Sequence, residues 1–204
     1  MTAVAAQSIA EAKRAARARA RRRRRAACEA AGPLAGEAAA RNFLAAIEPP
    51  PGCVVSGYWP LDDELDPRPL LEALHARGHV CGLPVVVGKG RPLVFRAWAP
   101  GQRLVPAVLG ISVPPEEAPE VTPEVVLAPL LAFDGRGFRL GQGGGYYDRT
   151  LAALRAQAAL RIGAAPVLAV GMGFAAQRLA RVPSDDSDQR LDWVVTERAA
   201  QEFA

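Results

Sequence analysis

The residues best suited to chemistry lie in a glycine-rich run, residues 141–149, which reads Gly-Gln-Gly-Gly-Gly-Tyr-Tyr-Asp-Arg. Glycine has no Cβ, so its backbone can adopt left-handed angles and approach a ligand closely. Successive N–H groups in such a loop, followed by a helix N-terminus, form a site for anions. The run therefore predicts a phosphate-binding loop. Asp148, just beyond it, supplies a carboxylate for the Mg²⁺ that accompanies a polyphosphate.

Two common phosphate motifs do not describe this run. No Gly-Lys-Ser/Thr follows, so it is not a P-loop, and it lies too late in the chain and holds two tyrosines, unlike a dinucleotide fingerprint. A structural interpretation also stays open, because glycine-rich turns are common and Asp148 could simply complement the positive end of a helix.

Length and composition predict a globular chain. Its 204 residues are 50% hydrophobic, enough for a sizeable core, so we expect a single domain over 1–204. No apolar run reaches the ~18 residues of a membrane span, and no secretory signal is recognisable. The three cysteines, Cys28, Cys53 and Cys81, form no CxxC pair, which favours a reduced, cytoplasmic setting.

Positive charge is concentrated at the N-terminus. Residues 1–25 hold nine of the 25 basic residues and one acidic residue, so the remainder, with sixteen basic and twenty acidic residues, is mildly acidic. A basic arm on such a body fits a nucleic-acid-binding protein. It equally fits an enzyme whose first helix supplies cations to a polyanionic substrate. Within this segment, the run of five arginines at 21–25 is expected to form a solvated helix face.

Strands and helices alternate along the chain. Ser8 to Glu11 has the form of a capping box and predicts the start of a basic helix at about 8–30. The proline-rich stretch 99–124 reads as loop, and Asp134 with Gly135 reads as a structural turn. We expect further helices at 34–47, 67–77, 145–160 and 175–180, and strands at 53–59, 80–87, 93–98, 125–133, 167–171 and 193–195.

These strands are almost continuously hydrophobic, which is typical of a mostly parallel sheet covered on both faces. The predicted fold class is α/β: one three-layer domain with a mostly parallel central sheet and helices on both faces. Ligands of such folds bind beyond the carboxyl ends of the strands. The glycine loop, between a strand and a helix, lies where such a site is expected.

The glycine loop and its surroundings resemble the 5-formyltetrahydrofolate cyclo-ligase family. The resemblance begins with Leu131 to Asp134 and continues from Gly137 through Arg139 to Arg149. Other segments agree in order and cover nearly the whole chain. They are Lys13 to Arg17, Tyr58 to Glu64, Leu83 to Val86, Gly171 to Phe174 with Gln177, Pro183 to Asp188, Leu191-Asp192 and Val195 to Glu197.

The resemblance implies an ATP- and Mg²⁺-dependent ligase that cyclises 5-formyltetrahydrofolate to 5,10-methenyltetrahydrofolate and releases ADP and phosphate. The formyl oxygen would attack the γ-phosphate, and N10 would then attack the resulting imidate. The implied partners are these two small molecules and no membrane, and we expect a monomer. Nucleic acid is not the expected partner, since the chain shows no aromatic-studded basic sheet.

The resemblance also implies roles for individual residues. Asp148 and Asp188 would hold Mg²⁺. The catalytic groups would be Arg139, Gly143, Gly144 and Tyr146. ATP would be bound by Lys13, Arg14, Arg17, Arg139, Leu140, Gly141, Gln142, Gly143, Gly144, Gly145, Tyr146 and Tyr147. The folate would be bound by Arg17, Trp59, Glu64, Gln142, Gly143, Gly144, Gly145 and Tyr146, with Glu64 accepting hydrogen bonds from the pterin.

Some positions depart from the family pattern. Ser187 stands where histidine or asparagine is usual, and Asp185 stands where a longer acid is common. Gln142 and Gly144 occupy positions that are basic in some members, and their lack of charge would weaken ATP binding if those cations matter. The alternatives are the nucleic-acid-binding protein, with a structural glycine loop, and a sugar-phosphate or CoA-handling enzyme of similar fold.

Overall fold

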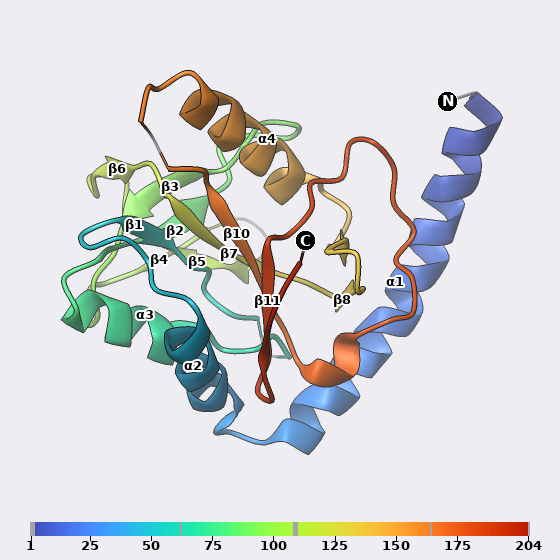
Figure 1. The fold of residues 1–204 in the computed structure, drawn as a ribbon, viewed down its shortest axis with the longest axis horizontal. Helices are drawn as coiled ribbons and strands as arrows, with labels where there is room; N and C mark the ends of the chain where they lie inside the picture. Colours follow the sequence, from blue (N-terminus) through green and yellow to red (C-terminus); the bar gives the residue numbers. More distant parts are fainter. Residues whose placement is uncertain (1–2, 62, 108–109, 164, 204) are drawn as a thin grey trace.

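The computed structural model describes residues 3–61, 63–107, 110–163 and 165–203. Its central sheet has the strand order β12-β11-β10-β7-β1-β2-β3-β6 (Figure 1). β11, β10, β7, β1 and β2 run parallel, and the outer strands β12 and β3 pair antiparallel. The strands are β1 Val54–Ser56, β2 Val80–Val85, β3 Val94–Ala97, β6 Glu120–Val121, β7 Val125–Pro129, β10 Leu168–Met172, β11 Trp193–Val195 and β12 Ala200–Glu202.

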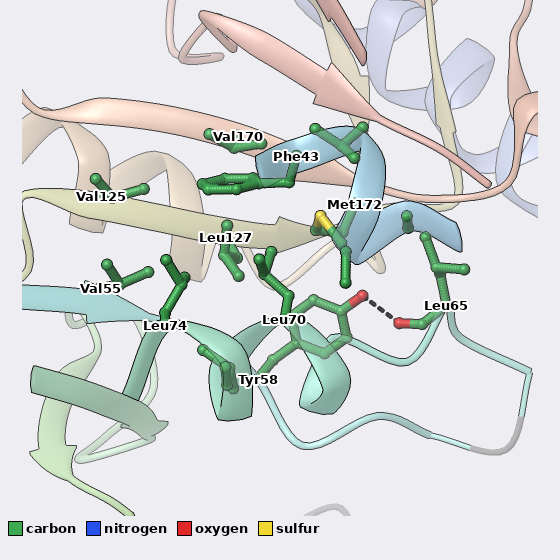
Figure 2. Packing of buried hydrophobic residues seen from close by; sticks show 14 of the residues in the cluster. Phe43, Val55, Tyr58, Leu65, Leu70, Leu74, Val125, Leu127, Val170 and Met172 are labelled. Carbon is green, nitrogen blue, oxygen red and sulfur yellow. Dashed lines mark hydrogen bonds between the residues drawn. The ribbon is translucent and has the colours of Figure 1, made fainter. Parts of the chain in front are cut away.

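Helices cover both faces of the sheet, as the continuous apolar strands predict. On one face, α2 (Ala35–Ala46) and α3 (Arg68–Ala76) contribute Phe43, Leu70 and Leu74 to the larger core cluster (Figure 2). On the other face, α4 (Tyr146–Ala159) packs through Leu151. Successive residues of β7 enter alternate clusters, so the central strand is buried on both sides. The predicted α/β class with a mostly parallel sheet is confirmed.

The first helix, α1 (Ala3–Ala31), lies beside the sheet layers and packs against the short 3₁₀ turn η2 (Ala175–Gln177) (Figure 1). Ala16 and Ala20 are buried against Leu131 and Leu140 of the β8–β9 hairpin region. The hairpin pairs β8 (Ala132–Phe133) with β9 (Arg139–Leu140). Alanine side chains are short, so α1 approaches this hairpin closely and its long cations extend past it.

Several predicted boundaries were wrong. α1 begins at Ala3, so Ser8 lies inside the helix and is not its cap; the alanine-rich residues before it are strong helix formers. The predicted strand 125–133 divides after Pro129, which has no N–H to continue the ladder.

The sequence interpretation also missed three short strands besides β12. The stretch 99–124, expected to be loop, contains β6 and a separate pair formed by β4 (Val105–Pro106) and β5 (Ser112–Val113). The helix expected over 175–180 is only the single turn η2. Two or three residues carry too little periodicity to reveal such elements.

The predicted structural turn at Asp134 is confirmed. Its carboxylate is fully buried and accepts hydrogen bonds from the backbone N–H groups of Val182 (2.8 Å) and Arg136 (2.9 Å), and from the Arg136 guanidinium (2.7 Å). Burial alone would raise the pKa of Asp134, but these hydrogen bonds outweigh it and lower the pKa. The side chain ties the β8–β9 hairpin to the segment that leads to Asp185 and Asp188.

Replacing Asp134 with alanine should therefore lower the free energy of unfolding by about 3 kcal/mol, because a buried hydrogen-bonded charge is lost and its donors lose their acceptor. Urea denaturation followed by circular dichroism would measure this. The matched control is Asp186→Ala, an exposed carboxylate, which should change stability by less than about 0.5 kcal/mol. Equal effects of the two substitutions would contradict the structural role.

Candidate active site

A cavity of about 1170 Å³ opens where several parallel strands end. Its wall includes residues just beyond the carboxyl ends of β1, β2 and β7, together with the glycine loop between β9 and α4. This is the edge at which α/β folds bind ligands. A second cavity of about 440 Å³, between the end of α4 and Phe203, contains none of the predicted site residues.

The cavity brings together every predicted site residue except one. Arg14 is exposed on α1 and does not line it. The remaining predicted residues all do: Lys13, Arg17, Trp59, Glu64, Arg139, Leu140, Gly141, Gln142, Gly143, Gly144, Gly145, Tyr146, Tyr147, Asp148 and Asp188. Residues from distant parts of the sequence therefore share one wall.

The glycine loop has the conformation that its composition predicts. Gly143 has φ +108° and Gly145, the residue preceding α4, has φ +65°, angles that residues with side chains rarely adopt. A Cβ on Gly143 would lie 3.2 Å from the Arg17 guanidinium carbon. The loop leads directly into α4, whose first N–H groups have no partner within the helix. The backbone is thus arranged to receive an anion.

Side chains of α1 hold this loop in place. Arg17 Nε donates to the Gly141 carbonyl (3.0 Å), and Arg21 donates through Nε (3.2 Å) and Nη2 (3.0 Å) to the Gln142 side chain. Burial, and then the neighbouring charge of Arg21, lower the pKa of Arg17. This crowding of positive charge next to the loop favours binding of an anion.

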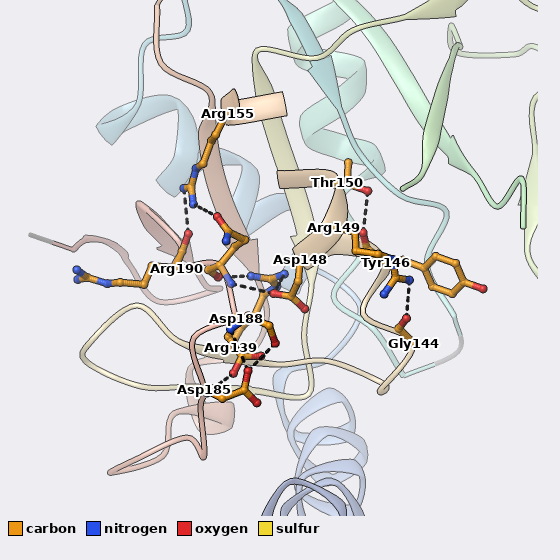
Figure 3. A network of polar contacts seen from close by, with 12 residues as sticks. Arg139, Gly144, Tyr146, Asp148, Arg149, Thr150, Arg155, Asp185, Asp188 and Arg190 are labelled. Carbon is orange, nitrogen blue, oxygen red and sulfur yellow. Dashed lines mark hydrogen bonds and ion pairs between the residues drawn. The ribbon is translucent and has the colours of Figure 1, made fainter. Parts of the chain in front are cut away.

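Two acidic side chains predicted to hold a metal form ion pairs with cations, and Figure 3 shows the pair of Asp148 with Arg139. Asp148 Oδ1 accepts hydrogen bonds from Arg139 (2.8 Å) and from the backbone N–H of Gln189 (3.0 Å). Both oxygens of Asp188 accept hydrogen bonds from Lys13 Nζ, at 2.9 and 2.6 Å. In the described part of the chain, no group of three or more His, Cys, Asp or Glu side chains is placed to hold a metal ion.

Lys13 also binds Asp185 (2.7 Å). Burial alone would lower the pKa of Lys13, but its hydrogen bonds to Asp185 and Asp188 outweigh burial and raise it. The hydrogen bond from Lys13, followed by that from Ser187, lowers the pKa of Asp185 to about 2. Ser187, which departs from the family pattern, donates to Asp185 through its hydroxyl (2.5 Å) and its backbone N–H (3.0 Å).

The part of the cavity wall that follows β1 is aromatic and acidic. Trp59 makes an edge contact with Trp98, with ring centroids 6.1 Å apart. Glu64 has a side chain only 8% exposed and accepts hydrogen bonds from Arg24 (2.8 Å) and from the Leu61 N–H (3.2 Å). The buried Tyr147 hydroxyl has no partner within the described chain, and burial, followed by the negative charge of Glu64, raises its pKa.

Sequence reasoning missed three cationic residues of the cavity: Arg24, Lys89 and Arg149. Arg24 was expected to be solvated with the rest of the arginine run, and that expectation was wrong, because its side chain is only 5% exposed. Its spacing was the available signal, since Arg17 and Arg24 are seven residues apart and share one helix face. Arg149 Nη2 donates to the Gly144 carbonyl (2.7 Å), and its guanidinium lies 5.2 Å from the centre of the Tyr146 ring.

The lowered pKa of Asp185 has a consequence for stability. A carboxyl whose pKa falls from 3.8 to about 2 on folding stabilises the protein above about pH 4, and this contribution disappears as the pH falls through about 2. The difference in free energy of unfolding between wild type and Asp185→Asn should therefore shrink from pH 5 to pH 2. Urea titrations across that range would measure it. When Lys13 is replaced by Met, the Asp185→Asn substitution should change the free energy of unfolding only slightly at every pH. If Asp185→Asn alone has an effect that does not vary with pH, the ion pair with Lys13 is not the source of the lowered pKa.

Comparisons with known proteins identify the family to which the chain belongs. The model of the 5-formyltetrahydrofolate cyclo-ligase family matches residues 9–197. The 5-formyltetrahydrofolate cyclo-ligase of Escherichia coli K12 is 41% identical over 103 residues, which cover 48% of this chain and 56% of that protein. The chain therefore matches little more than half the length of that relative.

Two solved structures are similar over almost the whole chain. The 5,10-methenyltetrahydrofolate synthetase of Aquifex aeolicus superposes with a TM-score of 0.67 at 26% identity, covering 96% of this chain and 92% of that one. The synthetase of Mycoplasma pneumoniae, at 19% identity, has the same fold, with a TM-score of 0.67 over 91% of this chain and 98% of that one. Because the family model matches nearly the whole chain, the protein belongs to the 5-formyltetrahydrofolate cyclo-ligase family.

Proposed function

We propose that the protein cyclises 5-formyltetrahydrofolate to 5,10-methenyltetrahydrofolate, using ATP and Mg²⁺. The observation that carries the proposal is the cavity itself. Lys13, Arg17 and the glycine loop form what we call its phosphate end, and the buried Glu64 carboxylate with Trp59 forms its folate end. Its volume of about 1170 Å³ is large for a single small ligand, which fits a site for two substrates. The E. coli and Aquifex relatives bear names of this activity.

The phosphate end would bind ATP. Backbone N–H groups of the glycine loop would donate to phosphate oxygens, and Lys13 and Arg17 would neutralise their charge. The Lys13 ammonium would exchange a hydrogen bond to Asp188 for one to a phosphate oxygen, since its three N–H donors can change partners. Leu140 and Tyr147, which precede and follow the loop glycines in the chain and line the cavity, would contact the nucleotide. Arg14, which is exposed, would reach ATP only from the cavity mouth.

Asp148 and Asp188 are suitable ligands for Mg²⁺, because it binds oxygen and usually takes one or two carboxylates together with substrate phosphates and water. Asp148 Oδ2 accepts no hydrogen bond from the described residues, which leaves it available. A bound Mg²⁺ would supply charge neutralisation for the transferring phosphoryl group. Arg139, only 4% exposed, would keep Asp148 oriented.

The folate end would bind the pterin. Glu64 would accept hydrogen bonds from the N–H groups of the ring, and Trp59 would pack against the ring face. Tyr146, Gly143 and Gly144 line the same cavity and would lie where the formyl group meets the γ-phosphate. Arg17, Gln142 and Gly145 also line it and would contact both substrates.

In the reaction, the formyl oxygen would form a bond to the γ-phosphorus, and the bond to the bridging oxygen of ADP would break. The N10 lone pair would then attack the formyl carbon, phosphate would leave with the C–O electrons, and the N10 proton would pass to solvent. Loop amides and Arg139 would stabilise the charge that develops on the phosphoryl oxygens.

The distribution of arginines on α1 favours the enzyme over the nucleic-acid-binding protein. Arg17 and Arg21 bind the glycine loop and Arg24 is buried, so these three cations contact the protein itself. No helix in the described residues is long and apolar enough to cross a bilayer. The single domain over 1–204, the monomeric state and the cytoplasmic location stay predictions.

The first test is formation of methenyltetrahydrofolate, followed by absorbance with 5-formyltetrahydrofolate, ATP and Mg²⁺. Product should require ATP and Mg²⁺ and disappear on chelation. Asp148→Asn, which keeps the acceptor for Arg139 but removes the charge, should lower turnover at least about a hundredfold and raise the Mg²⁺ concentration for half-maximal rate. Asp186→Asn is the matched control. No product from folded wild-type protein would refute the proposal, and salt-dependent binding of nucleic acid would then support the alternative.

The glycine loop supports a second prediction. Gly143→Ala should raise the KM for ATP about tenfold or more, because alanine disfavours φ +108° and its Cβ would displace Arg17. Gly141→Ala should have a clearly smaller effect, since Gly141 has ordinary angles and open space where a Cβ would lie. Steady-state kinetics with varied ATP would measure both. Equal effects of the two alanines would count against the proposed backbone cradle.

A further inference from the structure

Arg24 is a charged side chain buried at the folate end of the cavity. It is 4% exposed, and its guanidinium donates to two carboxylates, Glu64 Oε1 at 2.8 Å and Asp63 Oδ1 at 2.5 Å. Its third nitrogen, Nε, is buried without a partner in the described chain. The remaining cations of α1 that line the cavity, Lys13 and Arg17, lie at its phosphate end.

Stability alone does not account for this arrangement. The side chains of Arg24 and Glu64 are 5% and 8% exposed, so both charges have lost most of their hydration. A buried ion pair recovers that cost only with good geometry, and apolar residues of similar size are often as stable or more so. A buried ion pair that lines a ligand cavity is therefore better explained by a hydrogen-bonding role toward the ligand than by stability.

The geometry of Glu64 indicates that its carboxylate offers hydrogen-bond acceptors to the ligand. Arg24 and the Leu61 N–H each bind one oxygen of the carboxylate, which fixes its rotation. Each carboxylate oxygen has two acceptor positions, so acceptor capacity remains on both. Together, Arg24, Asp63 and Glu64 carry one net negative charge. The cluster is a fixed hydrogen-bond acceptor beside the cavity.

We propose that Arg24 is a positioning residue for the folate substrate: it holds the Glu64 carboxylate in the orientation that accepts two N–H donors from the pterin edge. This inference rests on the proposed function. Lys13 and Arg24 are eleven residues apart, about 16 Å along the helix axis. α1 therefore contributes to both ends of the cavity, neutralising phosphate at one and orienting the pterin acceptor at the other.

The test is a kinetic comparison of Arg24→Leu, Arg24→Lys and Arg25→Leu. Arg24→Leu should raise the KM for 5-formyltetrahydrofolate at least about tenfold, with less than about a twofold change in the KM for ATP, because only the pterin acceptor is disturbed. Arg24→Lys, which retains charge but not the fork that binds two carboxylates, should restore part of the loss. Arg25 is exposed and contacts neither carboxylate, so Arg25→Leu should behave as wild type.

A double-substitution cycle separates positioning from a structural role. Glu64→Gln should raise the folate KM, and adding Arg24→Leu should then change it by less than about twofold, because the group that Arg24 positions is already altered. Independent, multiplicative effects would overturn the inference. If Arg24→Leu does not fold, the Arg24→Lys variant is measured in its place. A KM for 5-formyltetrahydrofolate equal to that of the wild type in this variant would overturn the inference. Wild-type protein without turnover would refute the proposed function itself, whereas an active wild type with an unaffected Arg24→Leu refutes only the role of Arg24.

Discussion

The site depends on the close approach of α1 to the β8–β9 hairpin. Ala16 and Ala20 face the hairpin with 8% and 3% of their surface exposed, and they place the helix axis near Leu131 and Leu140. Larger side chains at these positions would push the helix away. The cations on the neighbouring face would then no longer reach the glycine loop or the carboxylates, so the packing of small side chains determines the electrostatics of the cavity.

The sheet supplies the second constraint. Because β1, β2 and β7 are parallel neighbours, their carboxyl ends meet at one edge, and the segments that follow them are brought together there. Trp59 and Glu64 follow β1, whereas the glycine loop lies about eighty residues later in the chain. Burial of the central strands on both faces makes this edge rigid, which suits a site that must align two substrates.

The charged side chains of the cavity form ion pairs with one another, and a charged ligand could replace one partner of each pair. Lys13 binds Asp185 and Asp188, and Arg139 binds Asp148, so the cations and carboxylates neutralise each other before any ligand enters. A polyphosphate with Mg²⁺ would offer each of them a partner of opposite sign. Asp134 is different: it is completely buried, and its partners are backbone N–H groups and Arg136, which makes it part of the framework.

The sequence by itself determined the fold class, the position of the glycine loop, the structural turn at Asp134 and the family, because apolar strand runs and glycine patterns are local features. The tertiary structure decided what depends on distant contacts. It showed that Arg14 does not line the cavity, that Arg24 is buried with Glu64, and that Asp148 and Asp188 are paired with cations. A run of five arginines is uniform in composition, and only the packing of α1 distinguishes Arg24, which is buried, from its exposed neighbours. The short strands β4, β5, β6 and β12 are each only two or three residues long, so no local pattern encodes them, and their pairing with a neighbouring strand defines them.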